Sequence, residues 1–94
     1  MDHVYKITGE VEQFPQNAGW YYVRVPVTIT EELEHLADRG LVAVRTTVGD
    51  TSWDTSLLPM GDATKFIALN ARVRSSNHLQ LGDLVTVSFS LRTR

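Results

Sequence analysis

The sequence contains no cysteine and no long apolar run. Without cysteine there is no disulfide framework, no thiolate nucleophile and no cysteine-based zinc site. No stretch approaches the roughly 20 apolar residues of a membrane span, and the first residues lack the basic start and apolar segment of a signal peptide. These absences lead us to expect a cytoplasmic protein with no membrane partner.

Glycine, proline and charged residues are present in ordinary amounts. The 94 residues include 6 Gly and 3 Pro, 43% are hydrophobic and 21% are charged, which is typical of a globular chain. A chain of this length is long enough for one core and too short for two. We therefore expect residues 1–94 to form a single domain.

The charges are distributed unevenly. Residues 1–63 carry 4 basic and 10 acidic side chains, whereas residues 64–94 carry 5 basic and 1 acidic side chain. A basic C-terminal part favours an anionic partner, while the simpler interpretation is a solvated acidic helix face followed by a frayed basic tail.

Alternation of apolar and polar residues predicts several short strands. In residues 84–92, for example, Val85, Val87 and Phe89 share one face, and Gly49-Asp50 is a typical hairpin turn. The predicted strands are residues 4–12, 20–25, 41–48, 53–58, 65–69 and 84–92. About six short strands at this spacing indicate a mainly β fold, either a barrel or a sandwich.

Helical spacing is confined to short segments. Ile29, Leu33 and Leu36 recur at the helical period and predict one helix over residues 31–38, with Thr30 as its N-cap. Asn70 is a second candidate N-cap, for a brief helical segment that includes Arg74.

Residues 44–62 (VRTTVGDTSWDTSLLPMGD) resemble the middle of a bacterial family catalogued as "domain of unknown function 1905". Residues 20–26 and 66–87 also fit, the latter with an apolar strand, a basic turn of helix and Leu-Gly-Asp before the last strand. The resemblance implies a small double-split β-barrel with one short α-helix, similar in outline to the AbrB and MazE regulators. It implies no activity, because the family has no established one. The family's second turn often reads Gly-x-Gly, whereas this chain has Gly61-Asp62-Ala63-Thr64.

One candidate ligand-binding site combines aromatic and arginine side chains. Trp20, Tyr22 and Arg24 share a face of one predicted strand, and Arg45 lies on the polar face of another strand near Trp53. Aromatic walls with a guanidinium suit a pocket for an anion. The alternative is that the helix at 31–38 covers this face.

A second candidate site is basic. Lys65, Arg72 and Arg74 would form a small patch that contacts phosphates if the AbrB-like architecture holds. The overall acidic balance and the lack of a dense basic stripe oppose nucleic-acid binding.

Catalytic and metal-binding patterns are sparse. His3, His35 and His78 have no ligand spacing, and no nucleophile motif or phosphate loop occurs. An enzyme that uses Asp54 with Arg45 stays open as a hypothesis, because fold does not dictate function. We expect no cofactor and no metal.

Our leading interpretation is a non-catalytic binding or interaction module. It would present the Trp20/Tyr22/Arg24 face, or an uncovered strand edge, to a protein or small-molecule ligand, and it predicts an exposed apolar patch. The alternatives are an AbrB-like nucleic-acid-binding regulator and an anion-binding barrel. Open strand edges also favour a homodimer.

Overall fold

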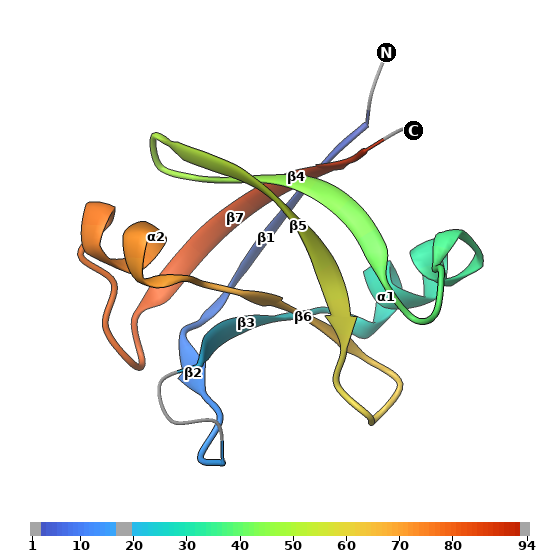
Figure 1. The fold of residues 1–94 in the computed structure, drawn as a ribbon, viewed down its shortest axis with the longest axis horizontal. Helices are drawn as coiled ribbons and strands as arrows, with labels where there is room; N and C mark the ends of the chain where they lie inside the picture. Colours follow the sequence, from blue (N-terminus) through green and yellow to red (C-terminus); the bar gives the residue numbers. More distant parts are fainter. Residues whose placement is uncertain (1–2, 17–19, 93–94) are drawn as a thin grey trace.

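The computed structural model describes residues 3–16 and 20–92, and it is mainly β (Figure 1). Within these ranges the chain forms seven strands, two α-helices and one 3-10 turn, because the first predicted strand is divided into two and the predicted segment after Asn70 is helical. The elements are β1 (Val4–Glu10), β2 (Glu12–Gln13), β3 (Tyr21–Val25), α1 (Val27–Leu33), η1 (a 3-10 turn, Glu34–Leu36), β4 (Val42–Val48), β5 (Thr51–Pro59), β6 (Lys65–Ala68), α2 (Ala71–Ser76) and β7 (Leu84–Leu91).

The strands follow the order β1-β7-β4-β5-β6-β3-β2, with every neighbouring pair antiparallel. Two stretches of chain belong to both halves of the barrel. The β1–β2 stretch pairs first with β7 and then with β3, and β5 pairs first with β4 and then, at Leu58 and Pro59, with β6. These two transfers make the fold a nearly closed, double-split β-barrel, as the family resemblance implies.

Val11 is the residue at which β1 leaves its partner. Its N–H donates to the carbonyl of Asp83 over 2.8 Å, and its carbonyl accepts from the N–H of Gly82 over 2.9 Å. These bonds tie the bend to the turn before β7, so the backbone groups of Val11 stay satisfied although it lies outside both ladders. The chain then continues into β2 on the other half of the barrel.

Strands β1 and β3 meet by side-chain packing, and the close approach at this seam requires a glycine at position 9. A Cβ atom on Gly9 would lie 2.7 Å from Cγ2 of Val23, a side chain with no exposed surface. Only a residue without a side chain lets the two strands approach this closely.

The prediction that Thr30 caps the first helix is wrong. Helix α1 begins at Val27, and the N–H of Thr30 donates to the carbonyl of Pro26 over 3.0 Å, within the helix. Pro26 has no N–H and a fixed φ, so it ends β3 and starts the helix at the same point. The α-helix ends at Leu33 and tightens into η1, several residues before the predicted end.

The second helical segment and the β4–β5 hairpin form as predicted. The side chain of Asn70 accepts a hydrogen bond of 2.9 Å from the N–H of Val73, which satisfies one of the free donors at the start of α2. In the turn after β5, Ala63 adopts a φ of 72°. This is the left-handed region, in which the second Gly of Gly-x-Gly would be unstrained.

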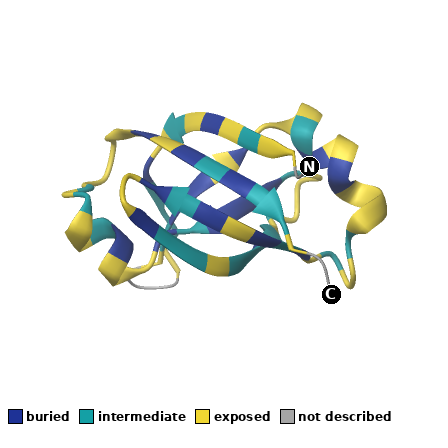
Figure 2. Ribbon diagram, turned by 90° about the horizontal axis from the view of Figure 1, so that it is seen from above, coloured by how far each residue is buried: buried dark blue, intermediate teal, exposed yellow. Residues whose placement is uncertain are grey.

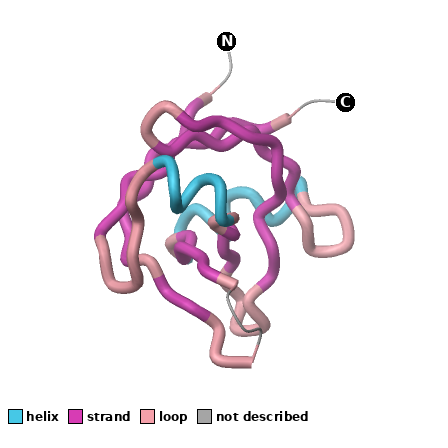
Figure 3. The backbone as a smooth tube through the Cα atoms, turned by 60° about the vertical axis from the view of Figure 1, so that its left-hand side comes forward, coloured by secondary structure: helices cyan, strands magenta, loops and turns pink. Residues whose placement is uncertain are grey.

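The interior is filled by alternate residues of the strands, visible as alternating bands in Figure 2. In β7, Val85, Val87 and Phe89 are buried, as predicted. Helices α1 and α2 lie at opposite ends of the barrel (Figures 1 and 2). In the view of Figure 3 the strands form a ring, and both helices are seen within its outline. No helix among residues 3–16 and 20–92 has the length and apolar character needed to cross a membrane.

Candidate functional site

A groove opens where β5 and β6 diverge. The two strands pair only at Leu58–Phe66 and Pro59–Lys65, so the opposite end of β5, around Trp53 and Asp54, has no ladder partner on that side. The groove has a volume of about 490 Å³, which is within the usual range for small-molecule sites. The split in the barrel therefore creates the hollow.

Three aromatic side chains line this groove. Trp20 precedes β3 and is 51% exposed, Tyr21 begins β3, and Trp53 belongs to β5. Exposed indole surface next to a hollow is unusual for a side chain that mainly packs a core. The structure thus brings together Trp20 and Trp53, two of the five residues predicted to bind a ligand.

The cation of the groove is Arg74 from α2. Its guanidinium carbon lies 4.1 Å from the centre of the Tyr21 ring, and its Nε donates to the carbonyl of Leu69 over 3.1 Å. Stacking and this hydrogen bond fix the plane of the guanidinium while leaving its terminal nitrogens available. Within the described part of the chain, no carboxylate lies at ion-pair distance from Arg74.

The carboxylate that borders the groove is already compensated. Asp54 lies 3.1 Å from Nη1 of Arg45 and 3.8 Å from Nη1 of Arg92. The unpaired charge of the groove is therefore the positive charge of Arg74. An anionic group beside a flat apolar group matches this combination of cation and indole walls.

The sequence of this chain matches the family model described as Domain of unknown function (DUF1905) over residues 8–89. It belongs to the DUF1905 family. The match includes both transfers of chain between the halves of the barrel and every side chain of the groove named above. A search of curated proteins finds none that matches this DUF1905 domain.

Arg45 does not line the groove with Trp53. In the β4–β5 register Arg45 is opposite Asp54, whereas Trp53 is opposite Thr46, a residue with no exposed surface. Because neighbouring residues of a strand point to opposite faces, Arg45 and Trp53 lie on different sides of the hairpin. Arg45 and Asp54, the pair of the enzyme hypothesis, form an exposed ion pair.

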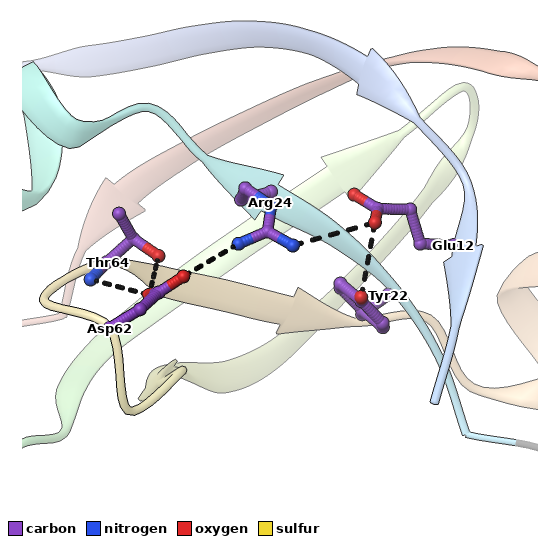
Figure 4. A network of polar contacts seen from close by, with 5 residues as sticks. All are labelled: Glu12, Tyr22, Arg24, Asp62 and Thr64. Carbon is purple, nitrogen blue, oxygen red and sulfur yellow. Dashed lines mark hydrogen bonds and ion pairs between the residues drawn. The ribbon is translucent and has the colours of Figure 1, made fainter. Parts of the chain in front are cut away.

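Tyr22 and Arg24 also lie outside the groove, in the network of Figure 4. Arg24 bridges Glu12 at 3.6 Å and Asp62 at 3.2 Å, and the Tyr22 hydroxyl donates to Glu12 over 3.2 Å. The network fastens β2 and the β5–β6 turn to β3. The Tyr22 ring stacks on Phe14, not beneath α1. Burial, followed by the charge of Glu12, raises the pKa of Tyr22.

The turn end of this network is held by Thr64. Its hydroxyl and its N–H both donate to the Asp62 carboxylate. These two hydrogen bonds, followed by the positive charge of Arg24, lower the pKa of Asp62. The side chains of Asp62 and Thr64 are therefore held in place by contacts within the protein itself.

The predicted basic patch is divided in the structure. Lys65 is 3% exposed and contacts Glu34 of η1 and the carbonyl of Gly40, whereas Arg72 and Arg74 belong to α2. The three cations therefore do not form one patch.

In the described ranges, no group of three His, Cys, Asp or Glu side chains has an arrangement suited to a metal ion.

Sequence reasoning placed Arg74 only in the basic patch and did not assign Tyr21 to a site. The Asn70 cap contains a usable signal, because it fixes where α2 starts and so places Arg74 in its second turn. The contact between Arg74 and Tyr21 has no local signal in the sequence, because the two residues are 53 positions apart and meet only in the folded barrel.

Proposed function

We propose that this DUF1905 domain is a non-catalytic binding module whose groove takes an organic anion with a flat apolar part. The observation that carries the proposal is the unpaired guanidinium of Arg74, held between the aromatic wall and the unpaired edge of β5. The apolar part would lie against Trp20 and Trp53, and the anionic group would accept hydrogen bonds from Arg74.

Intrinsic fluorescence tests the proposal directly. The chain has 2 tryptophans and both line the groove, so their emission reports on the site itself. We expect a saturable change with benzoate, a weaker one with benzyl alcohol, which lacks the charge, and none with acetate, which lacks the ring. Equal responses to all three probes would refute the proposed ligand class.

Two arginines of α2 provide a matched pair of variants. Arg74→Gln is expected to weaken benzoate binding about tenfold, the usual effect of losing one charge-assisted hydrogen bond. Arg72→Gln makes the same change on the same helix but outside the groove, and it should leave the affinity unaltered. Equal weakening in both variants would indicate nonspecific attraction and would contradict the assignment of the groove.

The same variants separate this proposal from a DNA-contacting regulator. With a short DNA duplex as probe, a regulator would lose binding equally in Arg72→Gln and Arg74→Gln, and its affinity would fall steeply as salt rises. That result, together with no response to benzoate, would favour the regulator. The buried position of Lys65 removes one of the three cations on which that alternative depends.

A further inference from the structure

A second hollow lies at the opposite end of the barrel, against α1. Its volume is about 570 Å³. Helix α1 and η1 form one wall, and the turn between β5 and β6 forms another. The side chains that matter for its chemistry are Thr30, Glu31, Glu34 and Lys65.

Lys65 supplies a buried ammonium group in which one N–H donor is unused by the described residues. Its Nζ donates to the carbonyl of Gly40 over 2.8 Å and lies 3.2 Å from Oε2 of Glu34. An ammonium has three N–H donors, and within the described part of the chain the third has no acceptor. Lysine is almost never fully buried unless its charge is paired, and here one of its hydrogen-bond positions remains open beside a cavity.

Thr30 adds a second unsatisfied polar group. It is 3% exposed, and its hydroxyl has no hydrogen-bond partner among the residues described. A buried hydroxyl without a partner costs stability, and a water or another bound molecule can supply the missing hydrogen bond. Thr30 and Lys65 both border this cavity.

The charges of the cavity disfavour a simple anion. Glu34 compensates Lys65, whereas the carboxylate of Glu31 has no cation at ion-pair distance within the described ranges. The unpaired charge of this cavity is therefore negative, the opposite of that in the groove at α2.

The turn that borders the cavity is fixed in advance. Asp62 is held by Arg24 and by the two donors of Thr64 (Figure 4). Gly61 faces open space, since a Cβ atom there would meet nothing within 4 Å. A wall that is already ordered reduces the entropic cost of binding.

We propose that this cavity binds a small amine that also carries an oxygen acceptor, such as an amino alcohol. The ammonium of the ligand would pair with Glu31, and its oxygen would accept hydrogen bonds from Lys65 and Thr30. The proposal concerns a second site, with opposite charge preference, and does not depend on the aromatic groove.

An amide NMR titration of the labelled protein at neutral pH tests the ligand class. Ethanolamine should give saturable shifts at the amides of Gly40, Gly61 and Thr64. Ethylamine and ethylene glycol should bind more weakly, because each offers only one of the two groups. An equal response to ethylamine, or no saturable shift with ethanolamine, would overturn the proposal.

Neighbouring glutamates of α1 provide the control. Glu31→Gln should weaken ethanolamine about fivefold, the effect of losing one exposed ion pair. Glu32→Gln should leave the affinity unchanged, because Glu32 accepts from the Tyr5 hydroxyl and does not line the cavity. Equal effects of both variants would refute the site.

The buried donors are tested by Lys65→Met, which should abolish the shifts. Should Lys65→Met fail to fold, Thr30→Val replaces the hydroxyl by a methyl group of similar size and so removes the donor. It should weaken ethanolamine while leaving ethylamine unaffected. A Thr30→Val variant that binds ethanolamine as tightly as the parent would contradict the assignment of the oxygen to the buried donors.

Discussion

Gly9 offers the sharpest test of how the barrel closes. Replacing it by alanine places a Cβ atom 2.7 Å from Cγ2 of Val23, closer than folded proteins tolerate. Val23 is fully buried on β3 and its branched side chain has little rotamer freedom, so it cannot move aside without disturbing its neighbours. The clash must therefore be relieved by moving β1 away from β3.

The size of the effect follows from two opposing contributions. Overpacking by one methyl group costs about 1–3 kcal/mol, whereas alanine loses less backbone entropy than glycine and regains roughly 0.5–1 kcal/mol. We expect Gly9→Ala to lower the free energy of unfolding by about 1–2 kcal/mol. In a domain of this size each kcal/mol corresponds to about 4–8 °C in Tm.

A double-mutant cycle isolates the contact. Val23→Ala alone should cost about 2–3 kcal/mol through the cavity it leaves. In Gly9→Ala/Val23→Ala the new methyl group enters the vacated space, so the combined loss should fall short of the sum by about 1–2 kcal/mol. Urea unfolding followed by tryptophan fluorescence measures all four proteins. Strict additivity, or a Gly9→Ala variant as stable as the parent, would refute the steric account of the seam.

Three further predictions concern the turns and caps. Asn70→Ala should lower Tm by about 4–8 °C in a thermal melt, because it removes a cap worth about 1 kcal/mol, whereas Asn70→Asp should not; equal losses would contradict the cap. Ala63→Gly should raise the urea midpoint by the equivalent of about 1 kcal/mol, since it relieves a left-handed alanine, and a lower midpoint would show that no strain is present. The lowered pKa of Asp62 stabilises the fold above the ordinary aspartate value, and this contribution is lost as pH falls through the lowered folded-state pKa. Asp62→Asn should therefore be less stable than the parent at neutral pH and should show a shallower decline in acid unfolding; identical pH profiles would contradict this linkage.

Local features predicted most of the elements correctly. Residues 84–92 alternate strictly, Gly49-Asp50 has turn chemistry, and Asn70 is a strong cap, so each specifies its structure through neighbouring residues alone. The prediction for Thr30 was wrong although threonine is a suitable N-cap residue, because Pro26 starts the helix earlier in the chain. Pro26 has the stronger effect, since it both ends a strand and supplies the first helical acceptor.

Two of the five residues predicted to bind a ligand lie together, and they meet across the split. Trp20 and Trp53 come together because β5 and β6 diverge after two paired positions. The β4–β5 register places Asp54 opposite Arg45, whereas Arg24 pairs with Asp62 of the turn between β5 and β6. Sequence spacing does not reveal those partners.

The sequence by itself determined which segments are strands, where the hairpin turns and which faces are apolar, because these depend on side-chain periodicity and turn chemistry over a few residues. Only the tertiary structure decided where β1–β2 and β5 pass from one half of the barrel to the other. Those transfers are set by long-range pairing and by the close approach at Gly9. They open the groove beside Arg74 and bury Lys65 next to Glu34 and Gly40, so the chemistry of both hollows depends on contacts that no local pattern encodes.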